Sequence, residues 1–225
     1  MNPDLILRQL PIGPMQNFVY LIGSKKAREC LVVDPAWDTR AILDAAAADD
    51  LKITGSLVTH YHPDHVGGSA LGFGVPGGVV ELLERAPGKV HVHRDEADGL
   101  KFVTGVQEGD LLRHDANDKL TLGDVTVELL HTPGHTPGSQ CFLVDGALVS
   151  GDTLFIDGCG RVDLPGGDPE EMMRTLTTRF SRLPDDVILY PGHDYGRVPH
   201  ATMGEQRRTN RYLRMRSLDD WLDLA

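Results

Sequence analysis

Three histidines and an aspartate stand within six consecutive positions, in the sequence HYHPDH at 60–65. They follow the apolar run SLVT, which predicts a buried strand ending where the cluster begins. In extended backbone His60 and His62 share a direction, whereas Asp64 and His65, just before a predicted helix, can face a second point. Neutral imidazoles packed this densely beside a buried strand would lack polar partners without a cation. The stretch therefore predicts a metal site with room for two ions.

Further metal-ligand residues come one at a time, each where an apolar run meets a loop. His135 lies in the Gly/Pro turn of LLHTPGHTPGS, Asp152 ends LVSGD, and His193 follows ILYPG. His131, in the first of these stretches, is equally a strand-end residue, a partner of a ligand or an exposed side chain. Together with the first cluster, the predicted ligands are His60, His62, Asp64, His65, His135, Asp152 and His193. Seven nitrogen and oxygen donors suit two borderline metal ions and leave a position for water.

Short β-rich runs separated by turns carry these residues. Apolar and β-branched patterns predict strands within the first 34 residues, at 56–59, and at 89–93, 119–123, 125–132, 139–145 and 147–152. Helical spacing predicts helices after 38 and at 79–86, 94–102, 168–182 and 201–214. The Gly- and Pro-rich segment 70–88 is expected to be a loop with a short helix, either a lid over the substrate or an ordinary connection. Strands interspersed with helices indicate mixed sheets covered by helices, an α/β arrangement.

Length and composition limit the class of protein. The 225 residues are expected to form a single domain spanning 1–225, with 40% apolar and 24% charged residues. The net charge of −11 argues against a nucleic-acid partner, and no apolar run is long enough for a membrane span. The N-terminus does not look like a signal peptide, so a soluble, cytoplasmic protein is expected, with its oligomeric state left open. Cys30, Cys141 and Cys159 are far apart and odd in number, which predicts neither disulfides nor a thiolate zinc site.

The chain resembles the metallo-β-lactamase fold superfamily over nearly its whole length. The family's five landmarks occur in order as Asp34 in LVVDPA, then HYHPDH, His135, Asp152 in SGDTLF and His193 in PGHD. The resemblance implies an αββα sandwich of two mixed β-sheets flanked by helices, with the metals at one edge. His91, His93, His114 and His200 match no landmark and are expected to lie outside the site.

By position match, the resemblance implies two ligand sets. The first metal would take His60, His62 and His135, and the second Asp64, His65 and His193. Asp152 and a water or hydroxide would bridge them. The two ions are expected to be divalent, with Zn²⁺ as the favoured metal. They would lower the pKa of that water toward 7 and polarise the carbonyl that it attacks. Asp64 would also orient the hydroxide, which makes it the predicted catalytic residue.

Within the superfamily, the stretch SGDTLFIDGCGRVDLPGGD at 150–168 looks like glyoxalase II and also like the persulfide dioxygenases. The resemblance favours a dinuclear zinc thioesterase, a hydroxyacylglutathione hydrolase-like enzyme acting on a small-molecule glutathione derivative. The alternative is a persulfide dioxygenase with one Fe²⁺ at His60, His135 and Asp152, acting on glutathione persulfide. A metal-stabilised binding protein without catalysis is the third hypothesis. The chain departs from full-length glyoxalase II because only about thirty residues follow His193.

Two residues are candidates for substrate contacts. The Arg161 guanidinium could bind a substrate carboxylate, although an ion pair with Asp163 or Asp168 is an equally good interpretation. His131 or Tyr195 could line the substrate side of the site. Cys159 is interpreted as a small packed residue, because no general base is placed beside it.

Overall fold

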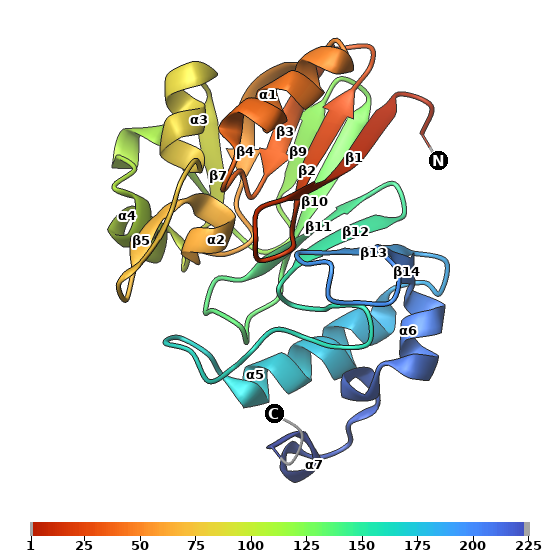
Figure 1. Ribbon diagram of the computed structural model, residues 1–225. Coiled ribbons are helices and arrows are strands. Elements are labelled where there is room, and N and C mark those ends of the chain that lie inside the picture. Colours follow the sequence, from red (N-terminus) through yellow and green to blue (C-terminus); the bar gives the residue numbers. More distant parts are fainter. Residues whose placement is uncertain (1, 223–225) are drawn as a thin grey trace.

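Two six-stranded sheets lie face to face, and helices cover the outer side of each (Figure 1). This computed structural model describes residues 2–222. Its α/β architecture, with two mixed sheets between helical layers, confirms the predicted αββα sandwich.

The first sheet has the strand order β1-β2-β3-β4-β7-β8. The β1–β2 and β2–β3 pairs are antiparallel, and the pairs from β3 to β8 are parallel. Its strands are β1 (Leu5–Ile12), β2 (Asn17–Ser24), β3 (Glu29–Val33), β4 (Lys52–Leu57), β7 (Lys89–His93) and β8 (Leu111–His114).

The second sheet has the order β14-β13-β12-β11-β10-β9, and only β12 and β13 pair in parallel. Its strands are β9 (Lys119–Leu122), β10 (Val125–His131), β11 (Gln140–Val144), β12 (Ala147–Gly151), β13 (Ile188–Pro191) and β14 (Ala201–Thr202). A separate hairpin consists of β5 (Gly68–Ala70) and β6 (Phe73–Val75).

Helices cover both outer faces. On the first sheet lie α1 (Thr39–Ala48), α2 (Pro63–Val66), α3 (Val79–Arg85) and α4 (Ala97–Thr104), and on the second lie α5 (Pro169–Arg174), α6 (Met203–Thr209) and α7 (Leu218–Leu222). Side-chain caps fix several helix starts, since Asp38 accepts from Ala41 N at α1 and Thr202 forms a capping box with Glu205 at α6.

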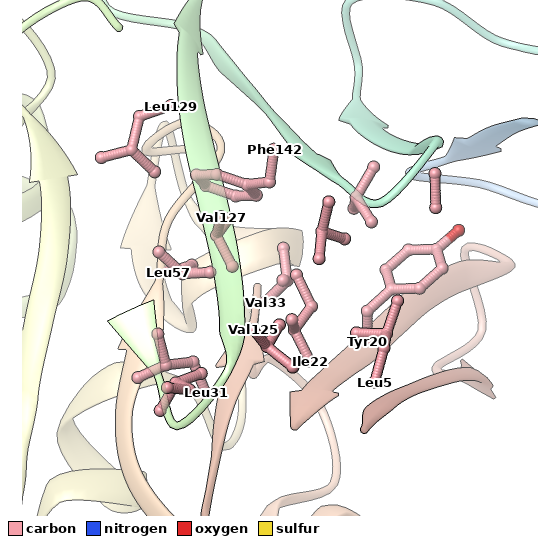
Figure 2. Close-up of a cluster of buried hydrophobic side chains, with 14 of the residues drawn as sticks. Leu5, Tyr20, Ile22, Leu31, Val33, Leu57, Val125, Val127, Leu129 and Phe142 are labelled. Atoms are coloured by element: carbon pink, nitrogen blue, oxygen red, sulfur yellow. The ribbon is translucent and has the colours of Figure 1, made fainter. Parts of the chain in front are cut away.

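Strand β2 shows how the sequence builds the sandwich. All eight of its residues are buried, because side chains that alternate along a strand meet a different layer on each face. Tyr20 and Ile22 point into the core between the sheets, whereas Val19 and Leu21 pack with α1 and α3. Figure 2 shows the core side, where Tyr20 and Ile22 gather with Val127 and Phe142 of the second sheet. The sheets are thus held together by apolar burial, which stabilises by about 25 cal/mol per Å².

Several predicted elements differ in detail from the observed ones. The predicted helix 168–182 is α5 followed by a π turn (Thr175–Arg179) and a 3-10 turn (Phe180–Arg182), and 201–214 begins with β14 and ends in a 3-10 turn (Arg211–Arg214). The segment 70–88 contains α3 as expected, but residues 68–75 form the β5–β6 hairpin rather than a loop. Strand β8 and this hairpin escape prediction because strands of three or four residues carry too little periodicity to be recognised.

No helix within residues 2–222 combines the length and the apolar character needed to cross a bilayer.

Candidate metal centre

The HYHPDH stretch lies at the carboxyl end of β4 and on α2. Pro63 opens α2 as its first residue, and His62 is the preceding cap in extended backbone. The turn from strand to helix separates the directions of His62 and His65, because His65 already belongs to the first helical turn. His60 and His65 are almost completely buried.

The other three predicted ligands come from the second sheet. His135, Asp152 and His193 follow the carboxyl ends of β10, β12 and β13. These three strands run in the same direction, so their ends meet at one edge of the sheet. Ring centroids of His60 and His135 lie 4.7 Å apart, and those of His65 and His193 lie 5.1 Å apart. The structure thus brings all seven predicted ligands to one place between the sheet edges.

A hydrogen bond on the outer nitrogen orients four of the imidazoles. His135 Nδ1 lies 2.6 Å from the Arg161 carbonyl, and His193 Nδ1 lies 2.9 Å from the Met15 carbonyl. A carbonyl only accepts, so each Nδ1 carries the proton and each Nε2 presents a lone pair.

Asp34 and Thr59 orient the remaining two rings. Asp34 Oδ2 lies 3.0 Å from His65 Nδ1 and also accepts from Thr59 Oγ1 at 2.6 Å. Since that hydroxyl donates to Asp34, its oxygen accepts from His60 Nδ1 at 2.9 Å. Both rings are thus held through Nδ1 and turn their Nε2 atoms inward, as in metal-binding histidines whose other nitrogen is held by a partner.

Inward-facing nitrogens approach one another closely. His65 Nε2 lies 3.2 Å from His193 Nε2, and His135 Nε2 lies 2.9 Å from His62 Nδ1. The outer carbonyl bonds leave His135 and His193 with lone pairs at these contacts, and His60 Nε2 is buried without a hydrogen-bond partner among the described residues. Nitrogens at such distances need either a proton or a metal cation between them.

Asp152 stands between two groups of nitrogens. Its Oδ1 lies 3.2 Å from His65 Nε2 and 3.4 Å from His193 Nε2, while its Oδ2 lies 3.7 Å from His135 Nε2. One carboxylate oxygen thus faces each group. Oδ1 is buried and has no hydrogen-bond partner within the described part of the chain, as expected of a metal-bridging carboxylate.

Among the described residues, four sets of three have ligand atoms within 4.8 Å of one another, and two of these match the sets that the resemblance implies. One is His60, His62 and His135; the other is Asp64, His65 and His193. Asp64 Oδ2 lies 3.4 Å from both His65 Nε2 and His193 Nε2, and Asn17 donates to it at 3.0 Å. Nitrogen-rich ligands with a carboxylate suit Zn²⁺ or Fe²⁺, so the residues fit two such ions.

Charge is concentrated in this buried centre. Burial raises the pKa of Asp152, but the neighbouring His65 and His193 outweigh it and hold that pKa well below its usual range. For His65, burial is likewise opposed by Asp152 and Asp64, which raise its pKa well above the ordinary value. Burial and the nearby His135 lower the pKa of His62 to about 4. The Asp152 carboxylate is thus ionised and can bind cations.

The sequence did not predict three residues that orient the ligands. Asp34 was identified only as a family landmark, and Asn17 and Glu96 were not identified at all. Glu96 precedes α4, is completely buried, and accepts from the backbone N–H of Tyr61 and of Gly138 at 2.8 Å each. It also accepts from the Thr136 hydroxyl at 2.7 Å. The Glu96 carboxylate is therefore hydrogen-bonded to the loop with His60 and His62 and to the loop with His135, which together carry the first ligand set. Burial raises the pKa of Glu96 to about 7 in spite of these three donors.

The two candidate substrate contacts lie at the edge of the centre. The guanidinium of Arg161 is exposed and pairs with both oxygens of Asp163, at 2.8 and 2.7 Å. Tyr195 is half-exposed, and its ring stacks on His193 with centroids 4.5 Å apart. His131 stacks on His93 and bonds the Pro137 carbonyl, away from the two ligand sets.

Fold and ligand geometry agree with a match to the Metallo-beta-lactamase superfamily over residues 12–193, so the chain belongs to that superfamily. The predicted resemblance is confirmed. With its paired His/Asp ligand sets, the protein is a metal-dependent enzyme of this fold.

The similar proteins include hydroxyacylglutathione hydrolases, persulfide dioxygenases and probable zinc-dependent hydrolases of polyketide biosynthesis. The chain is 36% identical over 179 residues to a hydroxyacylglutathione hydrolase of Aeromonas hydrophila, covering 80% of this chain and 61% of that protein. It is 29% identical over 211 residues to the mitochondrial persulfide dioxygenase ETHE1 of Homo sapiens, covering 92% and 75%. Among solved structures, TTHA1623 in a di-iron-bound form matches with a TM-score of 0.74 and 27% identity, covering 91% and 99%.

Proposed function

We propose that the protein is a dinuclear zinc thioesterase of the glyoxalase II type. The observation that carries this proposal is the pair of complete ligand sets with one oxygen of Asp152 facing each. A mononuclear enzyme needs only one set, whereas here Asp64, His65 and His193 are held as firmly as the first three residues. The likeness to a hydroxyacylglutathione hydrolase and to a di-iron structure supports the same reading.

His60, His62 and His135 would hold one ion, Asp64, His65 and His193 the other, and Asp152 would bridge them. A pair of ions in such a site supplies a water of lowered pKa and polarises a carbonyl. In the net reaction, water's oxygen bonds to the acyl carbon, the carbon–sulfur bond breaks, and the thiol and carboxylic acid leave. A thiol of pKa about 8.5 departs without a strong general acid, which the centre does not need to provide.

Residues of the chain orient the reactants. Asp64, fixed by Asn17 through both its side chain and its carbonyl, keeps one carboxylate oxygen at the second ligand set and orients the attacking water. Arg161 and Tyr195 are proposed to contact the substrate at the rim. The Arg161–Asp163 pair is exposed, so a substrate carboxylate can exchange with Asp163 at small cost.

A combined metal and activity assay tests the proposal. Protein purified without added metal should contain close to two ions per chain by elemental analysis and should hydrolyse S-lactoylglutathione. The matched variant Asp64→Asn should lower turnover strongly, while Asp124→Asn, a distant exposed aspartate, should leave it unchanged. One iron per chain without thioesterase activity would refute it.

The second candidate is a mononuclear iron persulfide dioxygenase, favoured by the likeness to ETHE1 over 92% of the chain. His60, His135 and Asp152 would form its 2-His-1-carboxylate site. Oxygen uptake with glutathione persulfide, measured on the same preparation, separates the two reactions. Uptake that follows the iron content would favour the dioxygenase.

A further inference from the structure

The β5–β6 hairpin carries an unusual tip. Its strands are joined by Leu71 and Gly72, which both have positive φ, at 52° and 80°. Such two-residue turns normally use Asn, Asp or Gly, because a branched side chain is strained in the left-handed region. Leu71 is also 89% exposed, and Phe73 beside it is 44% exposed. A strained backbone and an exposed apolar side chain at the same residue do not stabilise the fold, and they indicate a role in binding.

At the base of this hairpin, glycines allow two backbone segments to pack closely against each other. A Cβ on Gly67 would lie 2.3 Å from the Gly77 carbonyl, and one on Gly78 would lie 2.0 Å from the Val66 carbonyl. The base is therefore packed directly against the end of α2, which carries Asp64 and His65. The tip, by contrast, is free, since nothing lies within 4 Å of a Cβ on Gly72.

A chain of contacts connects the hairpin with the metal centre. The Phe73 ring packs edge-on against Trp37, with centroids 6.3 Å apart. Trp37 Nε1 donates to Asn17 Oδ1 at 3.0 Å, and Asn17 donates in turn to Asp64. The hairpin thus stands on the Asp64 side of the centre.

Two more exposed apolar side chains belong to this side. Met15, 37% exposed, provides the carbonyl that holds His193, and Tyr195, 53% exposed, stacks on the same imidazole. Of the six large apolar side chains that are exposed in residues 2–222, four therefore lie on segments joined to Asp64 or His193. We call these four, Met15, Leu71, Phe73 and Tyr195, the apolar rim. The other two are Phe102 on α4, a helix whose buried face packs with Val66 of α2, and Leu112 on β8.

Nearby cations are already neutralised. Arg197, beyond His193, pairs with Asp157 at 3.2 Å, and Arg161, whose carbonyl bonds His135 in the other ligand set, pairs with Asp163. The side of the centre next to His193 therefore presents apolar surface and stacked aromatic rings more than free positive charge.

We propose that the natural substrate carries an extended aliphatic acyl chain, which lies against the apolar rim while its thioester carbonyl reaches the metal centre. This inference rests on the proposed thioesterase activity. Fully buried, each methylene would strengthen binding about fourfold. At a half-exposed rim about twofold is expected, so four methylenes give roughly a fifteenfold preference.

A chain-length series tests the inference. S-Butyryl- and S-octanoylglutathione share one leaving thiol, so the ratio of their kcat/KM values reports only the acyl chain. We expect about a fifteenfold preference for octanoyl, falling to about threefold or less in Leu71→Asn/Phe73→Thr. Asparagine tolerates the left-handed turn and threonine suits a strand, so both changes spare the backbone. Phe102→Ser, which removes an aromatic ring that is more exposed than Phe73 and lies outside the rim, should keep the preference.

Product binding makes the test independent of turnover. Calorimetry of octanoate and butyrate with the metal-loaded protein should show the same preference and the same loss in the double variant. If no thioester is hydrolysed but octanoate binding still depends on the rim, the proposed function fails and the apolar site stands. Equal values for the two chain lengths, or an equal loss in Phe102→Ser, would overturn the inference.

Discussion

Histidines gather in two regions of this molecule, and the two are organised differently. In the metal centre, inward nitrogens of different rings come within 3.2 Å, and an outer hydrogen bond fixes most of those rings. Outside it, His93 and His131 stack in parallel at 4.0 Å with planes only 8° apart, and His91 bonds directly to His114. The lone pairs of parallel rings lie in separate planes and cannot point at one ion, although His93, Asp95 and His131 are close enough to be grouped. Orientation of the nitrogens, more than their proximity, makes a metal site.

Of the changes that test this comparison, removal of the Asp152 carboxylate should have the largest effect on metal content and activity. Asp152→Ala leaves the nitrogens of both ligand sets without the negative charge between them, so metal content should fall below one ion per chain. Activity should fall more than about 1,000-fold, because both ions depend on this residue. Elemental analysis after gel filtration checks the first expectation, with Asp124→Ala as control. Two retained ions would contradict the bridging role.

Glu96 connects the two histidine regions. It follows β7, which carries His91 and His93, and it accepts hydrogen bonds from the loops that hold the ligands of the metal centre. Its pKa is raised to about 7 from an ordinary 4.5, so between these values the folded state keeps a proton that the unfolded chain releases. The free energy of unfolding therefore decreases as pH rises through this window, by about 3 kcal/mol in total.

Glu96→Gln cannot titrate and should lack this contribution. Urea unfolding of both chelator-treated proteins at pH 4.5, 6 and 8 measures the difference. Parallel pH curves for the wild type and the variant would show that Glu96 keeps its charge throughout.

Asp34 should have a smaller effect, confined to metal affinity. Asp34→Asn keeps an acceptor for Thr59 but weakens the bond that orients His65, and changes of this kind cost about 10- to 100-fold in metal binding. Competition with a chromophoric chelator measures the dissociation constants. An unchanged affinity for the second ion would exclude an orienting role for Asp34.

The smallest effect is expected in the outer region. His131→Gln retains a donor for the Pro137 carbonyl and should leave two ions per chain, with affinity within about threefold of the wild type. The same chelator competition serves as the measurement. Loss of an ion would place His131 among the residues of the centre.

Local patterns predicted much of the fold because alternation and strand-end signals are strong where layers meet. Strand β7 was predicted at its observed bounds, and the ligand residues were recognised because each follows a buried strand. The carbonyls of Met15 and Arg161 could not be predicted as partners of histidines, since any residue offers a carbonyl and only the fold selects one. Leu71 was equally inaccessible, because nothing in its residue type signals a left-handed, exposed turn.

The ligands come from both sheets, with His60, His62, Asp64 and His65 beyond β4 and His135, Asp152 and His193 beyond β10, β12 and β13. A bound pair of ions would therefore cross-link segments that lie about 130 residues apart in the chain. Like a disulfide closing a long loop, such a tie lowers the entropy of the unfolded chain, by roughly 4 to 5 kcal/mol on the loop-closure estimate. Chelation would then loosen the two halves from one another, and proteases would gain access to the edge where the sheets meet.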